Sequence, residues 1–119
     1  VIDLMFEQKN IKKKGATMRL GSFPCHIEEG TRAKELYKKE VIEERHRHRY
    51  EFNNKYFDIY SKNGMTLCGL SPDKKLVEMI ECTNNDYYIA AQFHPEFKSR
   101  PTKPHVLFIG LVEASLKNK

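Results

Sequence analysis

Residues 87–96 read Tyr-Tyr-Ile-Ala-Ala-Gln-Phe-His-Pro-Glu, an apolar run followed by a sharp change to polar and turn-forming residues. From Tyr87 to Phe93 an extended chain would be apolar on both faces except at Gln92, which is typical of a strand covered on both sides inside a sheet. Ligand sites commonly gather where a buried strand leaves an α/β sheet. The sequence therefore predicts a buried strand here, with a candidate site at residues 94–96.

His94 and Glu96 form a candidate pair of general base and orienting carboxylate. On an extended backbone, side chains two residues apart leave the same face, and Pro95 biases His94 away from the helical region. A carboxylate that accepts a hydrogen bond from Nδ1 holds an imidazole in the tautomer that general base catalysis needs. The spacing alone also fits an ordinary strand end, with a solvated histidine and a surface ion pair.

The residues upstream predict an antiparallel region. Two runs, at residues 66–70 and 76–82, are joined by the turn-forming Ser71-Pro72-Asp73 and preceded by Asn63-Gly64, so we expect a hairpin. Strict alternation from Glu44 to Phe52 predicts another strand. One face of that strand would carry Arg45, Arg47 and Arg49, and the other His46, His48, Tyr50 and Phe52.

Short helices are expected between these strands and at the end of the chain. Thr31 is a candidate N-cap for an amphipathic helix that extends to Glu40, and a helical turn is expected at residues 54–60. An irregular strand bent at Gly21 and Pro24 is expected at residues 16–27, after a short apolar run at residues 1–5 and a surface loop at residues 7–14. A 3.6-residue spacing predicts a terminal helix packed on the sheet through Leu107, Phe108, Leu111, Val112 and Ala114.

The composition favours one soluble domain. The chain has 119 residues, of which 31% are charged, and no apolar run approaches the roughly 20 residues that cross a bilayer. It begins without an initiator Met or the features of a signal peptide, so we expect a cytoplasmic piece of a longer protein. The three cysteines are widely spaced and contain no Cys-x-x-Cys pair, which favours a reducing compartment.

Residues 92–96, QFHPE, resemble the Q-[FY]-H-P-E motif of class I glutamine amidotransferases, in which the His and Glu complete a triad with a cysteine. Within that family, residues 16–21 and 44–51 resemble the GTMRLG and ERHRHRYE stretches of the CTP synthases, and Ser99-Arg100-Pro101 follows the motif as in many of them. The resemblance implies that residues 1–119 are the C-terminal part of an α/β, flavodoxin-like three-layer fold. The whole domain would have a mostly parallel central sheet, and this part the antiparallel hairpin region.

The resemblance implies the glutaminase half-reaction, in which a Cys-His-Glu triad hydrolyses glutamine and the ammonia serves ATP-dependent amination of UTP to CTP. His94 would be the base and later acid, Glu96 its orienting carboxylate, and Arg49 a residue that binds glutamine, because a guanidinium fork suits its α-carboxylate. Arg19 and Arg47 would help to shape the site or respond to the activating nucleotide.

The resemblance also sets the expected partners of the chain. These are L-glutamine, the rest of the amidotransferase domain and a synthetase domain that uses ATP and Mg²⁺, with UTP, ATP and GTP acting on a tetrameric parent enzyme. No cofactor, metal, membrane or nucleic acid is expected on this segment.

The chain departs from the family in one chemical respect. The family's nucleophile lies upstream in a G-x-C-x-G-x-Q elbow that nothing here matches, so the segment alone is expected to be inactive. The three cysteines, Cys25, Cys68 and Cys82, lack the glycine turn that exposes a thiolate, and we expect them to be buried or half-buried. Phe6 and Ala16 replace a proline and a glycine that the family usually has, at positions without chemical roles.

The run Arg-His-Arg-His-Arg at residues 45–49 supports a second class of function, a basic nucleic-acid-binding module. Its arginines would contact phosphates and Tyr50 and Phe52 would stack on bases, consistent with a net charge of +5. Such binding would weaken steeply with salt, whereas glutamine binding would not. A metal site at His46 and His48 is disfavoured, because no further ligand lies at a suitable spacing.

Overall fold

The computed structural model describes residues 1–4 and 18–119. Its strands are β1 (Ile2–Leu4), β2 (Arg19–Ile27), β3 (Val41–His48), β4 (Tyr50–Phe52), β5 (Met65–Leu70), β6 (Val77–Cys82) and β7 (Ile89–Ala91). Its helices are α1 (Arg32–Tyr37), α2 (Phe57–Lys62) and α3 (Val106–Lys117), with 3₁₀ turns η2 (Asn54–Tyr56) and η3 (Pro95–Phe97). The expected loop at residues 7–14, and the departures at Phe6 and Ala16, lie outside the described residues.

An open sheet in the order β3-β2-β5-β6-β7 forms the centre, and β1 pairs with β4 in a separate small sheet. The expected hairpin is confirmed as β5 and β6, and every pairing in the described part of the chain is antiparallel. The mostly parallel sheet expected of the whole domain is therefore not seen in this part. Parallel neighbours need a long crossover, whereas β5, β6 and β7 follow one another through loops.

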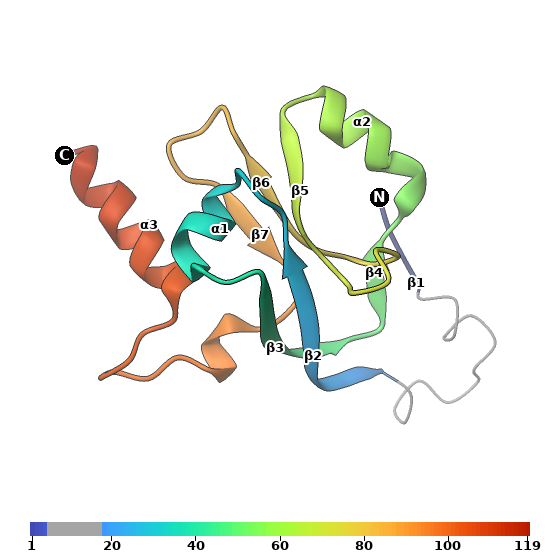
Figure 1. Cartoon of the computed structure of the whole chain (residues 1–119), viewed down its shortest axis with the longest axis horizontal. Coiled ribbons are helices and arrows are strands. Elements are labelled where there is room, and N and C mark those ends of the chain that lie inside the picture. The colour runs from blue at the N-terminus through green and yellow to red at the C-terminus, as the bar shows by residue number, and fades with distance from the viewer. Residues whose placement is uncertain (5–17) are drawn as a thin grey trace.

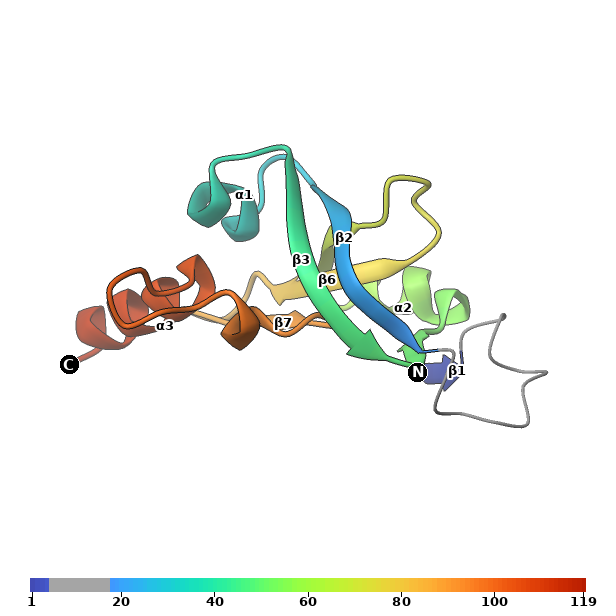
Figure 2. The ribbon, with the colours of Figure 1, turned by 90° about the horizontal axis from the view of Figure 1, so that it is seen from below.

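The antiparallel pair β2–β3, whose strands are connected through α1, is a long curved ribbon that runs at a steep angle to β6 and β7 in Figure 2. Among the described residues, β2 pairs with β5 where His26 and Ile27 lie opposite Leu70 and Gly69. The expected bend of β2 appears at Gly21, whose φ of 106° lies in the left-handed region. On the inner face of β3, Ile42, Glu44 and His46 are buried, and His46 Nε2 lies 3.7 Å from Glu78 Oε2 on β6.

Two apolar clusters form the core. The larger contains Cys25, Ile27, Ala33, Ile42, Cys68, Met79, Phe93 and Leu107, and the smaller Phe52, Leu67, Leu70 and Val77. At the junction of β2, β5 and β6 the backbones approach closely: a Cβ at Gly69 would lie 2.9 Å from Cys25 Sγ and 3.0 Å from Met79 Cβ. Only glycine fits there without displacing a neighbour.

The short helix α1 begins at its predicted N-cap. The Thr31 side chain accepts the Lys34 N–H at 3.1 Å. A carboxylate from β6 adds to this cap, because Glu81 accepts the backbone N–H groups of Arg32 and Ala33 at 3.0 and 3.1 Å. The helix ends at Tyr37, before the predicted Glu40, where Lys38 adopts a left-handed conformation.

Two predictions are wrong, one on the extent and burial of β7 and one on the packing of the terminal helix. The strand spans only Ile89–Ala91 and is half-buried, because the predicted Tyr87 and Tyr88 belong to the preceding loop. The predicted terminal helix forms, but α3 packs against α1 at one end of the molecule and not over the sheet (Figure 1). Most of its apolar residues are consequently exposed: Phe108, Ile109, Leu111, Val112 and Leu116.

None of the described helices is long and apolar enough to span a bilayer.

Candidate functional site

The His94–Glu96 corner has the geometry of an oriented base. His94 is extended, Pro95 opens the 3₁₀ turn η3, and the two side chains meet with His94 Nδ1 2.7 Å from Glu96 Oε1. A carboxylate only accepts, so Nδ1 carries the hydrogen and Nε2 keeps its lone pair in the neutral ring. The hydrogen bond from His94 lowers the pKa of Glu96. The His94 side chain is 37% exposed.

Backbone hydrogen bonds fix this corner to two strands. Gln92 donates its N–H to the carbonyl of Glu78 on β6 at 2.8 Å, and His94 donates its N–H to the carbonyl of Arg45 on β3 at 2.9 Å. Between them Phe93 is buried in the core. The His94 ring stacks on Phe97, with centroids 4.7 Å apart and an interplanar angle of 9°. The ring is therefore held by its carboxylate, its backbone and an aromatic face.

Arg49 lies at the break between β3 and β4, where the predicted single strand divides. It is half-buried, and its Nε is buried without a hydrogen-bond partner in the described part of the chain. An unpaired buried donor costs about 1–3 kcal/mol. The described contacts do not join Arg49 to His94 or Glu96 directly. Gln92, however, donates through Nε2 to the carbonyl of neighbouring Tyr50 at 3.1 Å, which brings the two segments together.

The two other arginines of the sequence analysis differ in their surroundings. Arg19 is ion-paired with Glu78 at 2.6 Å in the interior, and its guanidinium lies 4.5 Å from the centroid of the Phe23 ring. Arg47 is exposed on the outer face of β3. Their suggested response to an activating nucleotide stays a prediction, and Arg19 already has a strong anionic partner.

The alternation of β3 is confirmed, and it weakens the nucleic-acid interpretation. Arg45 and Arg47 are exposed, but His46 on the opposite face is 1% exposed. Phe52, one of the two proposed stacking side chains, is also buried. The basic residues therefore lack the paired aromatic platform on which single-stranded bases would stack.

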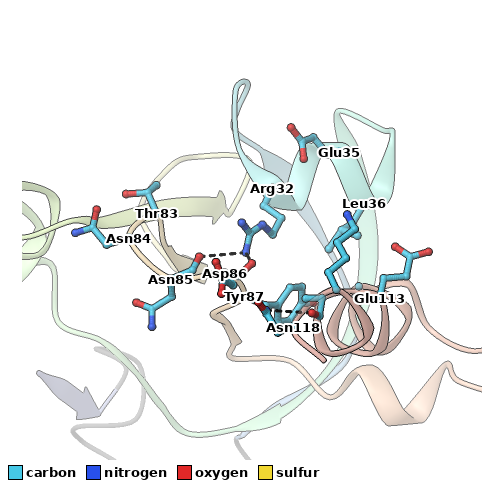
Figure 3. A pocket seen from close by; sticks show the side chains of 13 residues that line it. Arg32, Glu35, Leu36, Thr83, Asn84, Asn85, Asp86, Tyr87, Glu113 and Asn118 are labelled. Carbon is cyan, nitrogen blue, oxygen red and sulfur yellow. Dashed lines mark hydrogen bonds between the residues drawn. The ribbon is translucent and has the colours of Figure 1, made fainter.

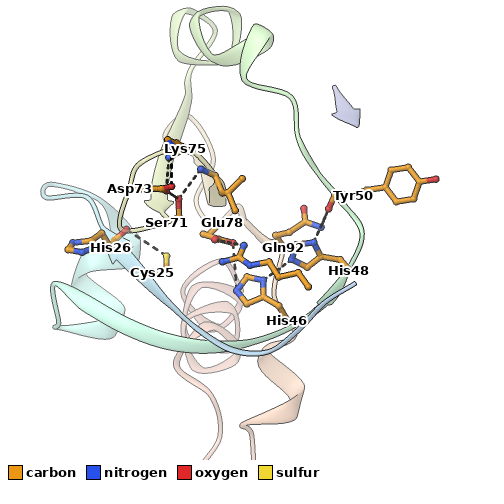
Figure 4. A network of polar contacts seen from close by, with 12 residues as sticks. Cys25, His26, His46, His48, Tyr50, Ser71, Asp73, Lys75, Glu78 and Gln92 are labelled. Atoms are coloured by element: carbon orange, nitrogen blue, oxygen red, sulfur yellow. Dashed lines mark hydrogen bonds and ion pairs between the residues drawn. The ribbon is translucent and has the colours of Figure 1, made fainter. Parts of the chain in front are cut away.

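A buried polar network that sequence reasoning missed lies next to the site (Figure 4). His46 Nδ1 is 2.8 Å from His48 Nε2, and His48 Nδ1 is 2.9 Å from the Tyr50 carbonyl oxygen. On the other side, His46 Nε2 lies 3.7 Å from Glu78 Oε2. Burial is the main reason that the pKa of His46 falls to about 3, that of His48 is lowered and that of Glu78 is raised. The signal was the alternation itself, which puts both histidines on the face that carries Phe52.

This network does not fit a metal ion. Ligand atoms of His46, His48 and Glu78 lie within 4.8 Å of one another, close enough to share one. The guanidinium of Arg19, however, already supplies positive charge 2.6 Å from the Glu78 carboxylate. A cation placed beside it would meet strong like-charge repulsion.

A second buried network, also missed, anchors the segment after the site. Glu44 on β3 accepts from His105 Nε2 at 2.8 Å and from the Tyr37 hydroxyl at 3.2 Å. The other ring nitrogen of His105 accepts the Leu107 N–H at 3.2 Å and caps α3. Burial, followed by Glu44, raises the pKa of Tyr37. The network joins β3, α1 and α3 beside Arg45, the residue whose carbonyl holds His94.

The pockets found among the described residues do not include His94 or Glu96 in their linings. A polar pocket of about 480 Å³ is formed by α1, the β6–β7 loop and α3 (Figure 3), where the Arg32 guanidinium donates to the carbonyls of Asn85 and Asp86. None of its lining residues belongs to the predicted site. An apolar groove of about 220 Å³ lies behind the corner and includes Pro95, Phe108 and Leu111.

The cysteines of the chain have the surroundings of packing residues. Cys25 and Cys68 are fully buried and Cys82 is half-buried, as predicted. Burial raises the pKa of Cys25 to about 12, and it raises the pKa of Cys68 as well. Neither buried thiol is suited to act as a thiolate nucleophile.

Comparison with known proteins gives a consistent set of relatives. The sequence model of the family described as glutamine amidotransferase class-I matches residues 2–114. A CTP synthase of Caldanaerobacter subterraneus subsp. tengcongensis is 58% identical over 119 residues, which is 100% of this chain and 22% of that protein. The CTP synthase of Staphylococcus aureus strain JH9 is 58% identical over 117 residues, which is 98% of this chain and 22% of that protein. This chain thus spans about a fifth of the length of these relatives.

A solved structure is also similar. The glutaminase domain of Trypanosoma brucei CTPS with bound acivicin has a TM-score of 0.88 and 33% sequence identity, and the match covers 98% of this chain and 46% of that one.

Proposed function

Because the chain belongs to the class I glutamine amidotransferases and is similar along its whole length to CTP synthases, we propose that it supplies the histidine and glutamate of a Cys-His-Glu triad. The observation that carries the proposal is the 2.7 Å contact of His94 Nδ1 with Glu96 Oε1, inside the family's motif. It leaves the lone pair of Nε2, in a partly exposed ring, free to take a proton. The nucleophilic cysteine would come from the remainder of the domain.

In this proposal His94 moves the protons of an acyl transfer. Its Nε2 takes the thiol proton, the thiolate sulfur bonds to the carboxamide carbon of glutamine, and the C–N bond breaks as His94 returns the proton to the leaving ammonia. His94 then deprotonates the water that cleaves the thioester, which gives glutamate and the free thiol. Glu96 stabilises the imidazolium that forms in each step.

Arg49 would bind the α-carboxylate of glutamine. Arg49 is half-buried, and a carboxylate offers two acceptors to a guanidinium fork. A charge-assisted hydrogen bond of this kind contributes about 1.5–3 kcal/mol. Lysine would bind less well, because it cannot make the paired contact.

The wider activity is proposed from the relatives. Ammonia released at this site would pass to a synthetase domain, where ATP and Mg²⁺ serve the amination of UTP to CTP. GTP activation, a tetrameric state and a cytoplasmic location are part of the same proposal. The chain alone would lack glutaminase activity, because Cys25 and Cys68 are buried and protonated.

A glutaminase assay tests the proposal in three proteins: this chain alone, the complete enzyme with the upstream cysteine, and that enzyme with His94→Ala. We expect activity only in the complete enzyme and a loss of about 10³-fold or more in His94→Ala. Ammonia-dependent CTP synthesis should persist, since it bypasses the glutaminase site. His26→Ala is the matched control at a half-buried histidine outside the site, and full glutaminase activity of His94→Ala would refute the proposal.

A further inference from the structure

The proton positions on His46 and His48 can be assigned by starting from the Tyr50 carbonyl, where their hydrogen bonds end. The Tyr50 carbonyl oxygen can only accept, so His48, at 2.9 Å, must carry its hydrogen on Nδ1. The neutral His48 ring then has a lone pair on Nε2. That nitrogen accepts from His46 Nδ1 at 2.8 Å, so His46 carries its hydrogen on Nδ1 too. The hydrogen bonds therefore run in one direction, from His46 through His48 to the carbonyl of Tyr50.

His46, at the inner end of this series of hydrogen bonds, is held rigidly. The His46 ring lies edge-on to Phe23 and Phe93, with centroid distances of 5.6 and 5.8 Å. Its free nitrogen faces the buried Glu78, which is paired with Arg19 at 2.6 Å. Packing against the two aromatic rings fixes the His46 ring, and burial keeps it neutral by lowering its pKa. A fixed His46 in turn fixes His48.

The outer end lies where the backbone has least support from strand pairing. β3 pairs with β2 up to His48, whereas β4, from Tyr50, pairs with β1 in the other sheet. Arg49 falls between the two pairings. The carbonyl beside it is held instead by two side chains, His48 Nδ1 at 2.9 Å and Gln92 Nε2 at 3.1 Å. Gln92 is two residues before His94, so one carbonyl connects the Arg49 backbone to the segment of the base.

We propose that His48 is a positioning residue for glutamine binding, which holds the Tyr50 carbonyl and thereby sets the position of Arg49 relative to His94. The proposal rests on the proposed function, because it requires Arg49 to bind the substrate carboxylate. His48 itself touches neither substrate nor reacting atoms. Its loss should weaken glutamine binding and leave the chemical step intact.

The test compares two amides at residue 48 in the complete enzyme. In His48→Asn the side-chain nitrogen occupies the place of Nδ1 and can still donate to the Tyr50 carbonyl. In His48→Gln the amide lies one bond further out, at the place of Nε2, and leaves that carbonyl to Gln92 alone. We expect His48→Gln to raise KM for glutamine about tenfold, with kcat within about twofold, as for the loss of one hydrogen bond. His48→Asn should stay within about threefold of the parent KM.

Two controls accompany this comparison. Ammonia-dependent CTP synthesis, which does not use the glutaminase site, should match the parent enzyme in both variants and reports that they are folded. His26→Gln makes the same substitution at a half-buried histidine outside the network and should not change KM. Equal KM values in His48→Asn and His48→Gln, whether both raised or both normal, would overturn the positioning role.

A third variant decides the case in which His48→Gln loses ammonia-dependent synthesis as well. Gln92→Met removes the other donor to the same carbonyl and leaves both histidines in place. For Gln92→Met, a raised KM for glutamine at constant kcat supports the proposal, and an unchanged KM overturns it.

His94→Ala distinguishes failure of the proposed function from failure of the positioning role of His48. If glutamine hydrolysis survives in that variant, the proposed function fails. If hydrolysis is lost but the KM of His48→Gln is normal, only the positioning role fails.

Discussion

In the proposed function, catalysis at the His94–Glu96 pair depends on which ring nitrogen of His94 carries the hydrogen. Glu96→Gln keeps the shape of the side chain but offers an amide that can donate to Nδ1 and so favours the wrong tautomer. We expect kcat for glutamine hydrolysis to fall about 10²–10⁴-fold in the complete enzyme, with ammonia-dependent synthesis retained. Steady-state assays with glutamine and with ammonia measure both. An unchanged glutaminase rate would mean that Glu96 is only a surface partner of His94.

His46 gives the molecule a specific acid sensitivity. Its pKa falls from 6.5 to about 3 in the folded state, mainly through burial. Below pH 6.5 the unfolded chain therefore takes up a proton that the folded chain refuses, so stability decreases as the pH falls from 6.5 towards 3. The limiting slope is about 1.4 kcal/mol per pH unit. His48, whose pKa is also lowered, acts in the same direction.

The variant His46→Gln should remove part of this dependence. We expect its thermal midpoint to drop less than that of the parent protein between pH 7 and pH 5, although it starts lower because a well-packed ring is lost. Differential scanning calorimetry at both pH values measures the difference. A parallel shift of both proteins would show that other groups cause the acid sensitivity.

Among the elements, α3 is held in part by His105, the residue that precedes it. His105 caps the helix through Nδ1 and donates to the buried Glu44 through Nε2. We expect His105→Ala to destabilise the protein by about 2–4 kcal/mol, since it removes a cap and a partner of a buried carboxylate. His105→Asn keeps a capping oxygen and should lose less. Urea unfolding of the three proteins measures this order, and equal stabilities would contradict the anchoring role.

A separate prediction concerns the stability of variants at Gly69, which lies at the junction of β2, β5 and β6. An added Cβ would lie 2.9 Å from Cys25 Sγ and 3.0 Å from Met79 Cβ, so Gly69→Ala should cost about 1–3 kcal/mol. Cys25→Ala removes one of the two close contacts. The double variant should therefore be less destabilised than the sum of the single ones, because the two sites share a contact. Simple additivity in urea unfolding would show that the clash is relieved elsewhere.

How far the sequence predicts an element depends on whether its contacts are local. The strand β3, the N-cap Thr31 and the hairpin β5–β6 were predicted correctly, because alternation, capping and turn preferences act over a few residues. The division of β3 from β4 at Arg49 was missed, since it depends on pairing with β1, far away in sequence. The contact of His94 with Glu96 is likewise local and was expected, but the extended backbone assumed for it was wrong, because Pro95–Phe97 form the 3₁₀ turn η3.

The partners of His46 and His48 could not be predicted from local sequence. Glu78 is 32 residues from His46, and Gln92 is 42 residues from Tyr50. The β2–β3 ribbon, β6 and the segment after β7 must come together before these groups meet. The alternation shows that the histidines face inward, but not which polar groups they will find there. The network that would position Arg49 is therefore a property of the whole fold.

At the scale of the whole molecule, the terminal helix is the clearest difference between pattern and structure. The apolar spacing predicts a helix that packs on a sheet, yet Leu111, Val112 and Leu116 are 49%, 57% and 57% exposed. The groove beside Leu111 and Phe108 continues this apolar surface to Pro95, next to the site. The chain covers 46% of the similar glutaminase domain. In the proposed function this surface would pack against the part of the domain that carries the cysteine.

The last prediction follows from that exposed surface. In the complete enzyme, Leu111→Glu would place a charge in the apolar contact, so we expect the domain to lose about 2–4 kcal/mol of stability and glutaminase activity to fall. Lys117→Glu introduces the same residue near the end of the same helix, outside the groove, and should cost well under 1 kcal/mol. In the isolated chain, where nothing covers the groove, both substitutions should be nearly neutral for folding, and Leu111→Glu should reduce binding of a hydrophobic dye. If Leu111→Glu is equally mild in both proteins, the α3 surface does not contact the rest of the domain.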